Sequence, residues 1–195
     1  MLTIPNILTL IRLLLVPCFI AASVRGMFTV AFVLFVSAAV TDILDGMIAR
    51  RLNQGSRIGA LLDPAADKTL MLAGYLFYTL SNRPLLRIPG WLTYLVLVRD
   101  FMIVTFAYLL HTRVRVTRFP PSIAGKMSTL LQAAALGGAI GVNAFGTVLL
   151  PLTQVLFRVA LVVTLYSSWD YLRRGERLLD NGLAAARLDG AGVAS

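Results

Sequence analysis

The sequence of 195 residues holds a single cysteine, a single histidine and only nine acidic side chains. Cys18 has no partner within the chain, so an internal disulfide is excluded. His111 ends an apolar run, and we interpret it as an interfacial residue rather than a catalytic one. No basic segment precedes the first apolar run, and Arg12 lies inside that run. We therefore expect a retained helix and not a cleaved signal peptide.

Apolar residues make up 58% of the chain, against roughly 45–50% in soluble domains, and the mean hydropathy is +0.81. The net charge of +9 could suggest a nucleic-acid partner. The basic residues, however, fall between the apolar segments and in the tail, where they set orientation and meet anionic lipid. We predict an integral membrane protein that binds no nucleic acid.

Six segments are apolar enough to cross a bilayer, which takes about 20 residues in a helix. They cover residues 5–23, 28–52, 64–81, 90–111, 121–143 and 151–173. The predicted fold is all-α, a six-helix transmembrane bundle over residues 1–174 with a polar site facing the cytoplasm. Residues 175–195 are rich in Ala and Gly, and we expect a cytoplasmic tail that begins as a surface helix and becomes disordered.

The arginines predict the orientation, because cytoplasmic connections carry the excess of basic residues. Two connections and the tail hold most of them: Arg50, Arg51, Arg57, Arg113, Arg115, Arg118, Arg173, Arg174, Arg177 and Arg187. The other side holds Arg25, Arg83 and Arg87. Both termini and the connection after the second segment should therefore face the cytoplasm, with the protein in the inner or plasma membrane.

Four of the nine acidic residues lie in or beside two apolar segments: Asp42, Asp45, Asp63 and Asp67. A carboxylate inside a membrane segment costs roughly 2.5–3.5 kcal/mol, so four together require cations. In the sequence, the nearby basic residues are Arg50, Arg51, Arg57 and Lys68. A hard divalent cation such as Mg²⁺, which prefers carboxylate oxygens, is the simplest partner.

The spacing of these acids supports a shared site. Asp42 and Asp45, at i,i+3, lie on one helix face, as do Asp63 and Asp67 at i,i+4. Residues 53–56 read as a turn, so the two helices should be antiparallel neighbours with their acidic faces together. Asp63 followed by Pro64 is typical of a helix N-cap and first residue, which predicts a helix beginning there.

The pattern Asp42-x2-Asp45-Gly46-x2-Ala49-Arg50-x8-Gly59-x3-Asp63-x3-Asp67 resembles the signature of the CDP-alcohol phosphotransferase family at every fixed position. Over nearly the whole chain the sequence is similar to that family's phosphatidylglycerophosphate synthases and cardiolipin synthases. The resemblance implies a transferase that moves a phosphatidyl group from CDP-diacylglycerol to an alcohol in the bilayer and releases CMP. It also implies a homodimer.

The resemblance further implies roles for single residues. Two divalent cations, Mg²⁺ or Mn²⁺, would be held by Asp42, Asp45, Asp63 and Asp67, and Asp67 would also be the catalytic base. Gly46, Ala49, Arg50 and Gly59 would line the CDP pocket. Asn6, Thr9 and Arg12 repeat at i, i+3, i+6. This stripe either faces the nucleotide or is a capped helix end with an arginine that reaches the membrane surface.

The acceptor site is expected on the later helices. Lys126 resembles the family's acceptor-binding lysine, and Lys126, Thr129 and Gln132 form a stripe that suggests a polar pocket wall. Arg99-Asp100 interrupts an apolar span. It is either a buried structural charge pair or an acceptor site in which Arg99 holds a phosphate. Gly137, Gly138 and Gly141 predict close helix packing.

Glycerol 3-phosphate is the favoured acceptor, because the basic candidates Arg99, Arg118 and Lys126 suit a free phosphate. Phosphatidylglycerol, the acceptor of cardiolipin synthases, is the alternative. The Arg99-Asp100 pair and the spacing from Lys126 to Thr129 depart from the glycerophosphate group and lean toward that alternative. A cation carrier is a reading of another class, but it gives no role to the glycine and arginine spacing.

Overall fold

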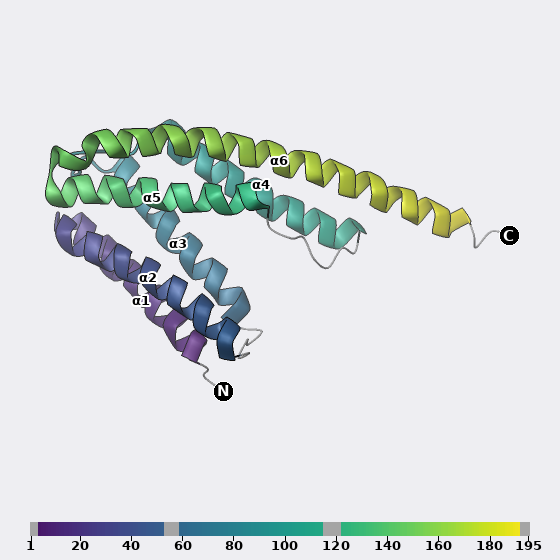
Figure 1. Cartoon of the computed structure of the whole chain (residues 1–195), viewed down its shortest axis with the longest axis horizontal. Helices are drawn as coiled ribbons and strands as arrows, with labels where there is room; N and C mark the ends of the chain where they lie inside the picture. The colour runs from purple at the N-terminus through teal and green to yellow at the C-terminus, as the bar shows by residue number, and fades with distance from the viewer. Residues whose placement is uncertain (1–3, 53–58, 115–121, 192–195) are drawn as a thin grey trace. The chain divides into compact units, whose positions relative to one another are not determined.

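A computed structural model describes the backbone of residues 4–52, 59–114 and 122–191, and the side chains of residues 11–42, 68–105 and 122–174. All the regular elements in these ranges are helical (Figure 1), which confirms the all-α prediction. The elements are α1 (Ile4–Val24), α2 (Phe28–Leu52), α3 (Gly59–Leu80), α4 (Gly90–Val114), α5 (Ile123–Phe145), the 3-10 helix η1 (Thr147–Leu149) and α6 (Leu150–Ala191).

The predicted boundaries agree within a few residues except at α3 and α6. The prediction that Asp63 caps a helix beginning at Pro64 is wrong, because α3 begins at Gly59 and both residues lie inside it. The signal misled because the capping pattern is local, whereas Pro64 is the sixth residue of α3 and has no amide to donate to the carbonyl of Ala60. At the other end of the chain, α6 continues as one helix through Ala191, past the apolar segment that predicted it.

The chain divides into two compact units, and each is described by itself. The first unit comprises Met1–Thr93 and Ala133–Leu156, and the second comprises Tyr94–Gln132 and Phe157–Ser195. The acidic stretch therefore belongs to the first unit. The predicted acceptor residues on α4 and α5 belong to the second unit.

In the first unit, α1 packs against α2 and α3 (Figure 1). Buried aromatic rings join the three helices: the ring centroids of Phe19 and Phe35 are 6.3 Å apart, and those of Phe19 and Tyr78 are 6.5 Å apart. A tight turn at Gly26, whose φ is 76°, connects α1 to α2. There the Met27 amide donates to the Ala22 carbonyl at 2.9 Å, a C-terminal cap that favours glycine at the left-handed position.

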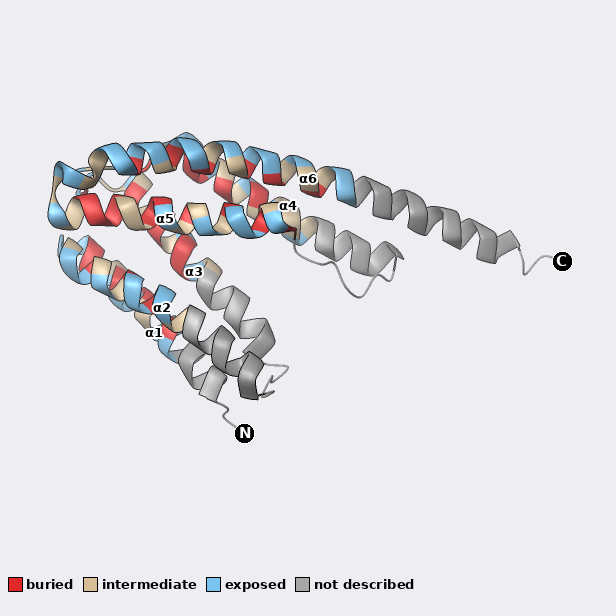
Figure 2. Ribbon diagram, in the orientation of Figure 1, coloured by how far each residue is buried: buried red, intermediate tan, exposed pale blue. Residues whose placement is uncertain are grey.

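Two of the described helices are long and apolar enough to cross a membrane, Ile123–Phe145 and Thr147–Arg174. The exposed side of α6 is mostly apolar, with residues such as Leu152, Val162 and Leu165. Its buried stripe combines the aromatic Phe157 and Tyr171 with small and polar residues, which are Thr153, Ala160, Thr164 and Ser167 (Figure 2). Small and polar residues inside with aliphatic residues outside are typical of helices that pack within a bilayer. The six-span count is not tested by these two helices.

Candidate active site

The acidic residues of the first unit lie on two helices that both adjoin α1. Asp42 and Asp45 belong to α2, and Asp63 and Asp67 belong to α3. The helical backbone supports the prediction that each pair shares a helix face. Of these four side chains, only that of Asp42 is described, and those of Asp45, Asp63 and Asp67 lie outside the described residues.

Asp42 pairs with Arg12 of α1, whose Nη1 lies 2.8 Å from the Asp42 Oδ1. The Arg12 side chain is only 1% exposed, whereas the Asp42 side chain is 46% exposed. One of the two sequence interpretations had Arg12 reach the membrane surface. Its burial contradicts that interpretation. The pairing also corrects the expectation that the acids' basic neighbours come only from residues 50–68, because Arg12 is distant in sequence.

The geometry of Asp42 allows it to bind a cation. One carboxylate oxygen faces Arg12, and nearly half of the side chain remains accessible. Among the residues with described side chains, no three His, Cys, Asp or Glu residues gather into a group that could hold a metal ion. That observation leaves the predicted quartet open, since three of its members are outside those residues.

In the second unit, Arg99 of α4 is buried and joins α4 to the start of α5. Its Nη1 donates to the Asp100 Oδ1 at 2.7 Å, and its Nη2 donates to the Gly125 carbonyl at 3.1 Å. The Thr129 Oγ1 lies 3.5 Å from the Arg99 Nη1. The Arg99 guanidinium also lies 6.0 Å from the ring centre of Tyr171 on α6. Arg99 and Asp100 are thus a charge pair, and Arg99 is bound to the backbone one residue before Lys126.

Three side chains hold the first turn of α5 in place, those of Ser122, Thr129 and Tyr171. The Gly125 amide donates to the Ser122 Oγ at 2.9 Å, as in a helix N-cap. The Thr129 hydroxyl donates to the Gly125 carbonyl at 3.2 Å. A β-carbon on Gly125 would lie 2.8 Å from the Tyr171 Oη, so glycine lets the Tyr171 side chain of α6 keep its place against this turn. Lys126, which follows directly, is therefore held on a rigid turn.

The predicted stripe of Lys126, Thr129 and Gln132 separates into three environments. Lys126 is exposed, Thr129 is half-buried beside Arg99, and Gln132 is buried. The Gln132 Nε2 donates to the Ser128 Oγ at 3.1 Å and to the Thr164 Oγ1 at 3.0 Å, so Gln132 links α5 to α6. Nothing in the sequence signalled the bond to Thr164, because that residue lies 32 positions away along the chain.

Seven of the remaining predicted site residues have side chains outside the described ranges, and their predicted roles stay predictions. They are Asn6, Thr9, Gly46, Ala49, Arg50, Gly59 and Arg118. Among the predicted acceptor residues, the structure brings Arg99 and Thr129 together. Sequence reasoning missed Ser122, Gly125 and Tyr171 as the residues that fix the turn before Lys126.

The comparison with protein families bears on whether the chain is a transferase or a cation carrier. A family model described as CDP-alcohol phosphatidyltransferase matches residues 2–166, which include all four acids of the motif. The chain belongs to this family. The resemblance noted on the motif is thereby confirmed, and the protein is a membrane-bound transferase of the CDP-alcohol phosphatidyltransferase class.

Individual relatives of this phosphatidyltransferase cover most of its length. A CDP-diacylglycerol–glycerol-3-phosphate 3-phosphatidyltransferase of Aquifex aeolicus is 34% identical over 179 residues, 90% of this chain and 97% of the relative. A probable phosphatidylglycerophosphate synthase of Mycobacterium tuberculosis is 32% identical over 178 residues, 88% of this chain and 81% of the relative. A probable cardiolipin synthase (CMP-forming) of Drosophila melanogaster is 32% identical over 186 residues, 87% of this chain and 56% of the relative.

Proposed function

We propose that this phosphatidyltransferase transfers a phosphatidyl group from CDP-diacylglycerol to glycerol 3-phosphate, making phosphatidylglycerophosphate and releasing CMP. The supporting observation is the complete acidic motif between Asp42 and Asp67, inside a family match over residues 2–166. The names of the Aquifex and Mycobacterium relatives, which this chain matches over most of their length, favour this acceptor.

Phosphatidylglycerol is the second candidate acceptor, which would make the protein a cardiolipin synthase. The name of the Drosophila relative favours it. A putative cardiolipin synthase of Mycobacterium bovis, 39% identical over 132 residues, or 66% of this chain and 59% of the relative, also does so. The cation-carrier interpretation finds no support in the family match.

Four carboxylates would hold the metal ions of the reaction: Asp42, Asp45, Asp63 and Asp67. Hard oxygen donors of this kind suit two Mg²⁺ or Mn²⁺ ions, and Asp42 has an accessible carboxylate beside its contact with Arg12. When bound, such ions would neutralise charge on the donor's diphosphate and on the leaving CMP. Gly46, Ala49, Arg50 and Gly59 of the motif, with Asn6 and Thr9 of α1, would line the CDP pocket.

Asp67 would act as the general base. It would take the proton from the acceptor hydroxyl as that oxygen bonds to the phosphorus bearing diacylglycerol, while the bond from this phosphorus to the oxygen of CMP breaks. Lys126, Arg118 and Thr129 would contact the acceptor. Arg99, which binds the Gly125 carbonyl, would contribute by holding the turn that carries Lys126.

The bundle would span the membrane six times, with both termini and the acidic site on the cytoplasmic side. The donor's acyl chains would then stay in lipid while its head group reaches the acids at the membrane surface. A homodimer is proposed from the family resemblance alone.

The function is tested with purified full-length protein in lipid nanodiscs. CDP-diacylglycerol is supplied with glycerol 3-phosphate, phosphatidylglycerol, inositol phosphate or serine, and both CMP and the lipid product are measured. We expect phosphatidylglycerophosphate from the first acceptor, inhibition by EDTA and recovery with Mg²⁺ or Mn²⁺. Asp67→Asn should lower turnover by at least roughly 10²-fold, the lower range for loss of a general base.

Asp180→Asn is the matched control, because Asp180 lies beyond the residues that the family model covers. It should retain normal turnover. Cardiolipin as the product would replace the first acceptor by the second. Absence of CMP release with every acceptor, or normal turnover by Asp67→Asn, would refute the assignment.

A further inference from the structure

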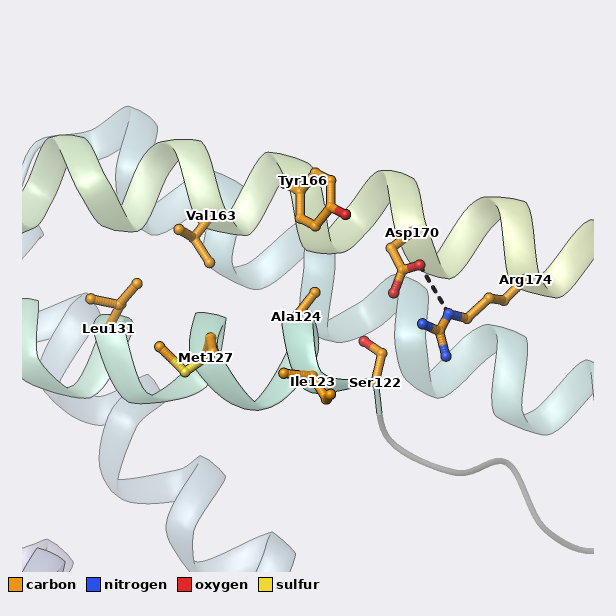
Figure 3. Close-up of a pocket in the computed structure, with 9 residues that line it drawn as sticks. All are labelled: Ser122, Ile123, Ala124, Met127, Leu131, Val163, Tyr166, Asp170 and Arg174. Carbon is orange, nitrogen blue, oxygen red and sulfur yellow. Dashed lines mark hydrogen bonds and ion pairs between the residues drawn. The ribbon is translucent and has the colours of Figure 1, made fainter.

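A pocket between the first turns of α5 and the middle of α6 combines an apolar wall with a charged end (Figure 3). Its volume is about 560 Å³, within the range of roughly 300–1,000 Å³ that ligand pockets show. Met127, Leu131 and Val163 contribute to the apolar wall, and Asp170 and Arg174 form the charged end. All of these residues belong to the second unit.

The charged end offers both hydrogen-bond donors and an acceptor. The Arg174 Nε donates to the Asp170 Oδ1 at 2.9 Å, and the Arg174 side chain is 49% exposed, so the rest of its guanidinium is accessible to an anion. The Asp170 Oδ2 is buried and has no hydrogen-bond partner among the described residues. A buried acceptor without a partner costs about 1–3 kcal/mol. A ligand that supplies a donor beside an anionic group would therefore fit this end.

The depth of the pocket in the membrane indicates which class of ligand it binds. The pocket lies where the span Ile123–Phe145 begins and the span Thr147–Arg174 ends. From Val163 to Arg174 the helix rises roughly 16 Å at 1.5 Å per residue. The apolar wall therefore extends into the hydrocarbon, and the charged end lies at the interface, as the exposed Tyr166 and Trp169 also indicate. At that depth an acyl chain, and not water, fills an apolar pocket.

We propose that this pocket binds one phospholipid molecule. One acyl chain lies along Met127, Leu131 and Val163, the phosphate accepts hydrogen bonds from Arg174, and a head-group hydroxyl donates to the Asp170 Oδ2. Selectivity comes from the head group, because a lipid tail is as apolar as the pocket wall. Phosphatidylglycerol, which carries hydroxyls, therefore binds better than phosphatidylcholine, which has no donor. The lipid need not react, so the site is independent of the proposed transfer function.

The test uses full-length protein in nanodiscs that contain phosphatidylglycerol or phosphatidylcholine with a photoactivatable group at mid-chain. Cross-linked peptides are identified by mass spectrometry. We expect cross-links at residues 123–131 and 163–170 with phosphatidylglycerol. Val163→Phe, which fills the pocket, should reduce them several-fold. Val162→Phe adds the same ring on the exposed side of α6, outside the pocket lining, and should leave them unchanged.

A second pair of variants tests the contact with the phosphate, which both lipids carry. Arg174→Gln should lower the cross-linking of each lipid by roughly tenfold, the effect of losing one hydrogen bond to a charged group. Arg173→Gln removes the same charge from the neighbouring residue, which lies over Trp169 at 4.7 Å and outside the pocket lining. It should leave the cross-linking of both lipids unchanged.

Two results would overturn the proposal: equal cross-linking of lipid to the Val163→Phe and Val162→Phe variants, or equal cross-linking of the two lipids to the unsubstituted protein. Monodisperse elution and the helical circular dichroism signal show whether each variant folds. If Val163→Phe does not fold, Ala124→Leu fills the same pocket with a smaller change.

Discussion

At the scale of single residues, one member of the Arg12–Asp42 pair is buried and the other is partly exposed. Arg12 is 1% exposed and Asp42 is 46% exposed, so the cost of removing a charge from water falls mainly on the arginine. Asp42 therefore has a structural task, which is to neutralise a buried cation, in addition to its proposed task as a metal ligand. Loss of the carboxylate should damage the fold as well as the reaction.

This dual task is testable with two variants. Asp42→Asn should lower the free energy of unfolding by about 1–3 kcal/mol, between the values for surface and buried pairs. Arg12→Met combined with Asp42→Asn also removes the buried cation and should recover most of that loss, while neither protein releases CMP. Denaturation in detergent gives the stability. Asp170→Asn weakens an i,i+4 pair with Arg174, whose side chain is 49% exposed, and is the control expected to cost about 0–1 kcal/mol.

A double variant as unstable as Asp42→Asn would contradict this account.

The sequence predicted Asp42 as a metal ligand, because i,i+3 spacing is local and can be read along the chain. It did not identify Arg12 as its partner, since that contact depends on how α1 packs against α2. For the same reason, Arg99–Asp100 could be recognised as a candidate charge pair, whereas the bond from Arg99 to the Gly125 carbonyl could not.

At the scale of helices, glycines set how closely α5 approaches its neighbours, as the sequence predicted. A β-carbon on Gly137 would lie 3.2 Å from the Phe35 ring, and one on Gly141 would lie 3.1 Å from Leu149. At Gly138 it would lie 2.9 Å from the Thr153 Oγ1. Thr153 cannot easily rotate away, because its hydroxyl donates to the Leu149 carbonyl at 2.8 Å and its side chain is β-branched.

Gly138→Ala should therefore destabilise the protein by about 1–3 kcal/mol, the usual cost of overpacking a core. Gly90→Ala is the same substitution at the start of α4, where the nearest atom to a new β-carbon is 4.0 Å away. It should be neutral or slightly stabilising, since alanine favours the helix. Thermal unfolding of both variants in detergent makes the comparison, and equal stability of the two would show that α5 can move away from Thr153.

The helices themselves were largely predictable, and their ends were less so. Long apolar runs predicted all six, because the length needed to cross a bilayer is a strong and local constraint. The start of α3 was misplaced, because Asp63-Pro64 matches a capping pattern although the helix already begins at Gly59. The length of α6 was missed because residues 175–191 have no apolar run, and only the backbone reveals that the helix continues.

At the scale of the whole molecule, a contact within the first unit joins the segment between α3 and α4 to the end of α5. The Asn143 Oδ1 accepts from the Leu86 amide at 3.2 Å, and its Nδ2 donates to the Leu86 carbonyl at 2.9 Å. The end of α5, just before η1, is thus bound to the segment between α3 and α4. These two connections must face the same side of the membrane, which is what a bundle of six spans requires.

The orientation can be measured by labelling single cysteines with a membrane-impermeant maleimide in a Cys18→Ser background. Leu85→Cys and Val148→Cys, 72% and 87% exposed in the unsubstituted protein, should react in intact cells, because the side poorer in arginine faces outward. Ser56→Cys and Ser195→Cys should react only after lysis. Labelling of Leu85→Cys and Val148→Cys from opposite sides would contradict the Asn143 contact. Labelling of all four positions from the opposite sides would be compatible with the same helix bundle. It would contradict the orientation, because the acidic residues would then face away from the cytoplasm, where nucleotide-activated donors are found.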